Sequence, residues 1–157
     1  MLSHLVPKEH LEAIGDVVVS HNLLEWYLIH LLSTLSGRPL SELRIFTSEM
    51  TSKQIRFSAS SFAAKQGSST KEQLKGMLTR HAKLEESRNQ IVHSVWGGSG
   101  GAIRAKVTRI KYSAKKELKL TLEKKDVDTL TLLAKNMREL AECYQDFASE
   151  IAKKNVE

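Results

Sequence analysis

Residues 127–151 read VDTLTLLAKNMRELAECYQDFASEI, and this stretch decides the fold class. Its large apolar side chains recur every three or four residues, which places them on one face of an α-helix. Either Asp126 or Asp128 can cap the start of this helix, because an aspartate oxygen accepts the first unpaired backbone N–H groups. A helix with one apolar stripe must bury it against other elements. The stripe consists of Val127, Leu130, Leu133, Met137, Leu140, Tyr144, Phe147 and Ile151.

Residues 7–36 carry the first of three further helical patterns. Pro7 suits the first position of a helix, and Gly37 with Pro39 ends it, which predicts a helix of about 28 residues. The following stretch, 38–50, leaves two alternatives open, a short helical turn or an ordered loop.

Two capping boxes predict where the next helices begin. Thr51 with Gln54 opens a second helix, and Ser69 with Glu72 opens a third, because each pair can satisfy two unpaired backbone donors reciprocally. The apolar spacing carries the third helix to about Trp96, where a run of glycines stops it.

Alternating apolar residues at about 102–124 predict a β-hairpin with a bulge near Thr108, where the alternation slips. Four amphipathic helices, three of them long, bury their stripes most economically in a bundle. The sequence therefore predicts a mainly all-α fold: an antiparallel four-helix up-down bundle with the hairpin inserted between the third and fourth helices. The length suits a single domain over residues 1–157.

Positive charge is concentrated in residues 104–125, which hold nine bases against two acids, whereas the whole chain carries +6. A nearly neutral body with one basic segment indicates a polyanionic partner such as RNA. The alternative is that the lysines keep an exposed strand edge soluble. The candidate RNA-binding residues are Arg104, Lys106, Arg109, Lys111, Lys115, Lys116 and Lys119.

Neither a membrane anchor nor a cofactor site is indicated. The chain has no apolar run long enough to span a bilayer, and its first residues lack a signal-peptide pattern, so we expect a cytoplasmic protein without a membrane partner. His21 and Glu25 lie one turn apart with His30 beyond them, but a zinc site needs a further ligand at a recognisable spacing. We therefore expect no metal and no cofactor.

Three polar residues near the end of the third predicted helix form the candidate catalytic site: Arg88, Asn89 and His93. Asn89 and His93 are four apart and share a face, whereas Arg88 lies nearer the apolar side, where it needs a carboxylate partner such as Glu25 or a subunit interface. These residue types suit RNA cleavage by the neighbouring 2′-hydroxyl, with histidine moving protons and arginine binding phosphate. Alternatively, His93 only caps the helix and Arg88 pairs with a nearby glutamate.

The stretch Arg88-Asn89-Gln90-Ile91-Val92-His93 resembles the R-N-x-x-x-H motif of HEPN domains (higher eukaryotes and prokaryotes nucleotide-binding), at the expected helix end. Chance would give only roughly 0.008 strict matches in a chain of this composition. The resemblance extends over nearly the whole chain, through the hairpin and the last helix.

The HEPN resemblance implies a homodimer in which two such helix ends join in one composite, metal-independent ribonuclease site. There His93 would be the general acid or base, Arg88 would hold the scissile phosphate, and Asn89 would position them. The family also implies a toxin or defence nuclease that an antitoxin or nucleotidyltransferase partner can control. Two alternatives stay open: a non-catalytic HEPN-like dimer that binds RNA or a protein through the basic hairpin, and a regulatory scaffold with no nucleic-acid role.

Overall fold

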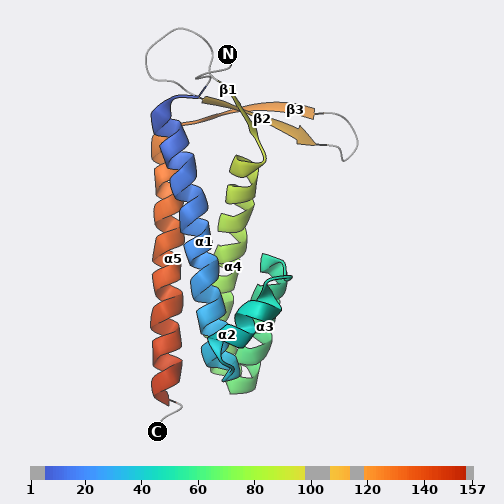
Figure 1. Ribbon diagram of the computed structural model, residues 1–157, viewed down its shortest axis with the longest axis vertical. Coiled ribbons are helices and arrows are strands. Elements are labelled where there is room, and N and C mark those ends of the chain that lie inside the picture. The colour runs from blue at the N-terminus through green and yellow to red at the C-terminus, as the bar shows by residue number, and fades with distance from the viewer. Residues whose placement is uncertain (1–5, 98–106, 114–118, 155–157) are drawn as a thin grey trace.

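The structure, a computed structural model, describes residues 6–97, 107–113 and 119–154. Its helices are α1 (Lys8–Ser36), α2 (Leu40–Thr47), α3 (Ser52–Gln66), α4 (Ser68–Val92) and α5 (Val127–Lys154), and its strands are β1 (Val95–Gly97), β2 (Val107–Ser113) and β3 (Lys119–Lys125) (Figure 1). The prediction of a mainly helical chain is confirmed. The stretch that left two alternatives open contains the short helix α2.

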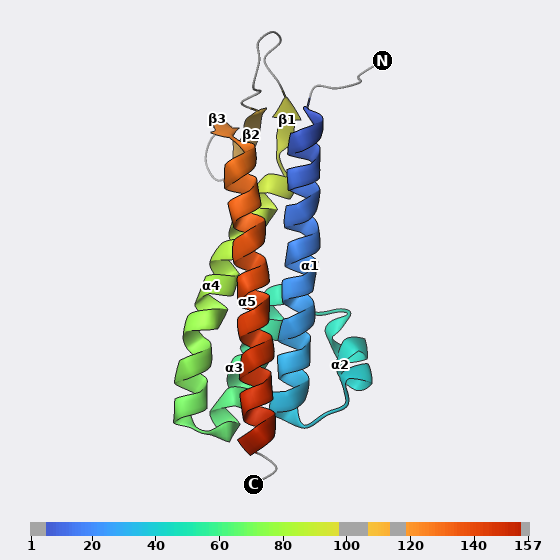
Figure 2. The ribbon, with the colours of Figure 1, turned by 90° about the vertical axis from the view of Figure 1, so that its left-hand side faces the viewer.

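The long helices α1 and α5 lie side by side and run in the same direction (Figures 1 and 2). At one end His10 Nε2 lies 3.3 Å from the carbonyl oxygen of Lys125, and further along both helices Arg138 donates to Asp16 at 2.7 Å. One contact lies near the start of both helices and the other lies further along both, so the two helices run parallel. The predicted up-down order, in which neighbouring helices alternate in direction, is therefore wrong for this pair.

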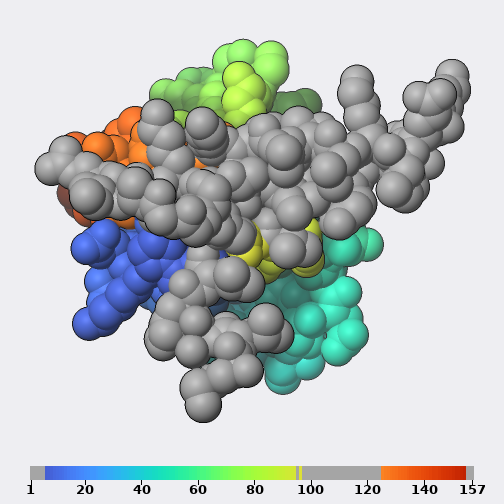
Figure 3. All heavy atoms as spheres, turned by 90° about the horizontal axis from the view of Figure 1, so that it is seen from above, coloured from blue at the N-terminus to red at the C-terminus, as the bar shows by residue number. Residues whose placement is uncertain are grey.

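Two connections explain the direction of the helices. The segment with α2 leads the chain back from the end of α1, so that α3 descends beside α1 and α4 runs upward (Figure 1). Helix α4 brings the chain to the end of the molecule where α1 begins, the strands lie across that end, and α5 starts there (Figure 1). Seen from that end, α5 and α1 occupy one side, with α4 and the α2–α3 segment around the rest of the bundle (Figure 3).

The core lies between α1, α4 and α5 and extends to α3. Leu24, Leu28 and Leu31 of α1 are fully buried, and they share the core with Met137 and Tyr144 of α5. These residues belong to the apolar stripes of the two longest helices, so their burial follows from the helical spacing. Within the part of the chain that the structure describes, no helix is long and apolar enough to cross a membrane.

The strands form a three-stranded antiparallel sheet in the order β1-β2-β3. In β1, Trp96 lies opposite Arg109 of β2. The residues of β1 had been predicted to form the end of the third helix, which was therefore predicted too long. Pairing of β2 with β3 runs without interruption from Val107 opposite Lys125 to Ser113 opposite Lys119, so the bulge predicted near Thr108 is absent from these strands. The remaining parts of the predicted hairpin, 102–106 and 114–118, lie outside the described residues.

Local capping agrees with the prediction at two helix starts and not at a third. Thr51 and Gln54 form the predicted capping box of α3, and Asp126 accepts from the backbone N–H of Thr129 at 2.8 Å, which identifies it as the cap of α5. Helix α4, by contrast, begins at Ser68, directly after Gly67. The φ of Gly67 is 127°, which a residue without a side chain adopts readily, so the chain turns within one residue and no capping box forms at Ser69.

Candidate active site at the end of α4

Helix α4 ends at Val92, and His93 is its C-terminal cap. The His93 N–H still donates to the carbonyl oxygen of Asn89 at 3.0 Å, so the helical spacing of these two residues is kept. The indole Nε1 of Trp96 donates to the carbonyl oxygen of Ile91 at 2.9 Å, and β1 then pairs with β2. The helix ends earlier than predicted, because the side chains of Trp96 and Ser94 satisfy the carbonyl groups of Ile91 and Gln90 and β1 pairs with β2. The His93 side chain is left exposed.

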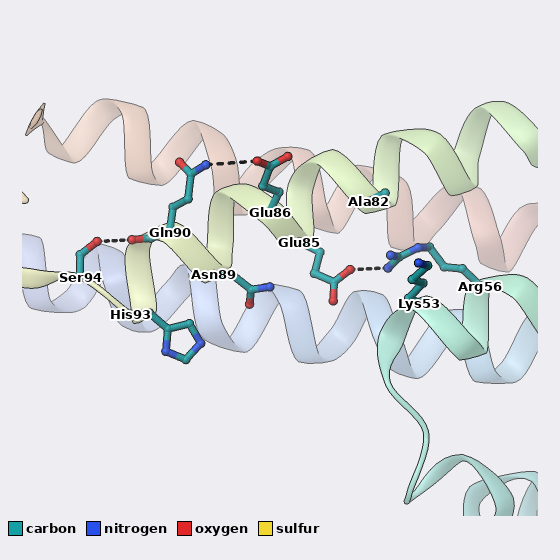
Figure 4. A pocket seen from close by; sticks show the side chains of 9 residues that line it. All are labelled: Lys53, Arg56, Ala82, Glu85, Glu86, Asn89, Gln90, His93 and Ser94. Atoms are coloured by element: carbon teal, nitrogen blue, oxygen red, sulfur yellow. Dashed lines mark hydrogen bonds and ion pairs between the residues drawn. The ribbon is translucent and has the colours of Figure 1, made fainter. Parts of the chain in front are cut away.

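Glu85, Asn89 and His93 follow one another on the same side of α4 at successive turns (Figure 4). They line a groove of about 560 Å³ between α3 and α4, together with Lys53, Arg56, Ala82, Glu86, Gln90 and Ser94. This volume lies within the usual range of small-ligand sites. The groove thus joins two of the three predicted catalytic residues, Asn89 and His93.

Arg88 does not line this groove. Its Nη1 donates to the side-chain oxygen of Asn89 at 2.9 Å, and its buried Nε has no hydrogen-bond partner among the described residues. The expected ion pair with Glu25 is absent from the described part of the chain: Glu25 lies one turn after His21 on α1, with 4.0 Å between its Oε2 and His21 Nδ1. The charge of Arg88 nevertheless acts on α1. Burial lowers the pKa of His21, and the nearby guanidinium of Arg88 contributes to lowering it.

The end of the groove away from His93 contains an ion pair that was not predicted from the sequence. Arg56 of α3 donates to Glu85 at 2.5 Å and to the Ser52 hydroxyl at 2.8 Å (Figure 4). Both charged side chains are mostly buried, at 13% and 21% exposed. Glu85 could have been recognised from the four-residue spacing that it shares with Asn89 and His93. Arg56 could not, because its partner belongs to another helix.

A buried hydrogen-bond network lies behind this ion pair. His81 is fully buried, with Nε2 3.5 Å from the Ser52 hydroxyl and Nδ1 3.1 Å from the hydroxyl of Tyr144. Tyr144 in turn donates to the carbonyl oxygen of Met77 at 3.5 Å. Every donor of the network is satisfied when the Ser52 hydroxyl donates to Nε2 of His81 and the Nδ1–H of His81 donates to the hydroxyl of Tyr144. This arrangement requires a neutral His81.

Burial lowers the pKa of His81 from 6.5 to about 3, with a further contribution from the charge of Arg56. An unfolded chain takes up a proton at this residue below about pH 6.5, whereas the folded protein does not until about pH 3. The contribution of His81 to the free energy of unfolding is therefore expected to fall as the pH is lowered through this window, by about 2 kcal/mol between pH 7 and pH 5. Urea unfolding at the two pH values measures the difference, and His81→Gln should lose most of it. An equal pH dependence in this variant would contradict the assignment.

The predicted RNA-binding residues divide into two groups. Arg109 and Lys111 lie on β2 opposite Glu123 and Thr121, and Lys119 lies on β3 opposite Ser113. The other four, Arg104, Lys106, Lys115 and Lys116, lie outside the described residues.

Residues 6–97, 107–113 and 119–154 contain no group of three histidine, cysteine or acidic side chains placed to hold a metal ion. The chain matches no family model, no curated protein and no solved structure.

Proposed function

We propose that this protein is a metal-independent RNA endonuclease of the HEPN type that acts as a homodimer. One observation carries the proposal: an exposed histidine, His93, shares a groove with Asn89, whose side-chain oxygen accepts a hydrogen bond from Arg88. A proton-transferring group, an amide and a guanidinium therefore meet at one helix end. RNA cleavage of this kind begins when a ribose 2′-hydroxyl attacks the adjacent phosphodiester, and that reaction requires these groups.

Each residue of the motif has a distinct role in this proposal. His93 accepts the proton of the 2′-hydroxyl or donates one to the leaving oxygen. Arg88 binds the phosphate, because a guanidinium has five donors and the hydrogen bond to Asn89 occupies one of them. Asn89 holds the guanidinium through its side-chain oxygen and lines the groove together with His93.

The homodimer follows from the chemistry of the reaction. Cleavage requires one group that takes up a proton and another that donates one, and a single groove contains one exposed imidazole among its described lining residues. Two helix ends facing each other would supply a pair of His93 and a pair of Arg88 side chains. In this proposal the basic segment 104–125 attracts the RNA, and an antitoxin or nucleotidyltransferase partner controls a toxin or defence activity.

The purified protein is expected to cut single-stranded RNA in the presence of a chelator and to leave a cyclic phosphate end. The 2′-oxygen becomes part of the product in this mechanism, and no metal-bound water takes part. Gel analysis of labelled RNA, with and without chelator, measures the cleavage, and end-group analysis identifies the product. Loss of cleavage on chelation, or a linear phosphate formed directly, would exclude this mechanism.

A second candidate is a non-catalytic HEPN-like dimer that binds RNA or a protein partner through the segment 104–125. The position of Arg88 favours it, since this side chain does not line the groove in the protomer described here. It predicts salt-sensitive RNA binding that is lost when Lys115, Lys116 and Lys119 are neutralised and is indifferent to His93→Ala.

A further inference from the structure

Lys53 of α3 stands where two depressions of the surface meet. It lines the groove that contains Asn89 and His93, and it also lines a second depression of about 550 Å³. The other residues of this second depression are Met50, Thr51, Gln54, Phe57 and Ser58. In the groove, Lys53 and Arg56 lie at the end opposite His93 (Figure 4). A strand of nucleic acid that runs from His93 along the groove would therefore reach Lys53 before it enters the second depression.

The charge of Lys53 is available to a ligand. Its side chain is exposed, and no ion pair or hydrogen bond of its ammonium group occurs within the described part of the chain. The neighbouring cation, Arg56, is engaged by Glu85 and Ser52. An unpaired lysine in a groove attracts a phosphate group, whereas an arginine already paired with a carboxylate does so weakly.

Phe57 supplies an aromatic surface one helical turn after Lys53. Its side chain is 73% exposed and lines the second depression, beside Met50 at 39% exposed. An exposed aromatic ring next to a cationic side chain is the combination that binds single-stranded nucleic acids, because every base has a face that can stack and every linkage has a charge.

We propose that Lys53 and Phe57 form a second nucleotide subsite, in which Lys53 binds a phosphate beyond the scissile one and Phe57 stacks the attached base. The proposal rests on the nuclease function and specifies its substrate as single-stranded RNA that extends past the cleavage site. A base in a duplex is covered by its neighbours and cannot reach the ring of Phe57. The residues of this subsite belong to α3, and none of them comes from the basic segment 104–125.

Binding of a short single-stranded 2′-O-methyl RNA tests the subsite, because this RNA lacks the attacking hydroxyl and is not cleaved. Fluorescence anisotropy over a series of salt concentrations gives both the affinity and its salt dependence. Lys53→Ala is expected to weaken binding and to reduce the slope of log K against log salt by about 0.7, the value for one phosphate contact on a single strand. Phe57→Ala is expected to weaken binding roughly fivefold or more with the slope unchanged, and Phe57→Tyr to restore it.

Two exposed residues that line neither depression provide matched controls. Lys83→Ala removes an exposed lysine of α4, and Ile45→Ala removes a side chain of α2 that is 73% exposed, as Phe57 is. Both controls should bind like the parent. Equal effects of Lys53→Ala and Lys83→Ala, or of Phe57→Ala and Ile45→Ala, would overturn the subsite.

The subsite and the nuclease function fail in different ways. If the protein cuts RNA but neither Lys53→Ala nor Phe57→Ala changes binding or cleavage, the nuclease function is supported and the subsite is excluded. If the protein binds the modified RNA through Lys53 and Phe57 but does not cut ordinary RNA, the subsite is supported and the nuclease function is excluded.

Discussion

Replacing His93 with alanine is expected to slow RNA cleavage by about a hundredfold or more, because the imidazole is the group that transfers protons at the proposed site. The effect should fall on chemistry and leave folding intact. The His93 side chain is exposed, and the contact that holds this residue at the end of α4 is made by its backbone N–H to Asn89. An alanine keeps that N–H.

The cleavage rate under single-turnover conditions measures this loss. Val92→Ala is a suitable control, since Val92 is the preceding residue, is 39% exposed and carries no titratable group. This control should cut RNA like the parent, and both variants should unfold at the same denaturant concentration as the parent. If His93→Ala cuts RNA as fast as the parent, the catalytic role of His93 is excluded. If neither protein cuts RNA and both bind it equally, the non-catalytic dimer is favoured.

Replacing Tyr144 with alanine is expected to lower the free energy of unfolding by about 3–5 kcal/mol. Tyr144 is the largest of the fully buried side chains and packs in the core that α5 shares with α1 and α4. Its removal leaves a cavity, and it also removes the hydroxyl that pairs with His81 at 3.1 Å. Both losses act in the same direction, because the buried imidazole then has an unsatisfied nitrogen.

Tyr144→Phe separates the two contributions. This variant keeps the ring and removes only the hydroxyl, so we expect a loss of about 1–3 kcal/mol from the unpaired nitrogen of His81. Denaturant unfolding at pH 7 measures both variants. A cost of Tyr144→Ala no larger than that of Tyr144→Phe would contradict the packing role assigned to the ring.

The features that depend on neighbours along the chain could be predicted from the amino-acid sequence. The spacing of apolar residues at 127–151 predicts α5, and the pair Thr51 and Gln54 predicts the start of α3, because both patterns act within one or two helical turns. The same reasoning brought Asn89 and His93 to one side of one helix. All of these contacts span at most a few residues, so they follow from helical geometry alone.

Only the tertiary structure decided how the helices run and what surrounds the motif. The parallel course of α1 and α5 depends on the segment with α2, which leads the chain back before α3, so that α4 ends and α5 begins at the end of the bundle where α1 begins. The end of α4 at Val92 depends on the pairing of β1 with β2, which joins Trp96 to Arg109.

The groove itself arises in the same way. Its ion pair joins Arg56 to Glu85, which are 29 residues apart in the chain, and Lys53 comes from the same distant helix. Arg88, which the sequence placed with His93, donates instead to its neighbour Asn89 and lies outside the groove. Contacts between distant segments depend on how whole helices pack. The spacing of residues within one helix shows which face is buried, and it does not specify which helix covers that face or in which direction that helix runs.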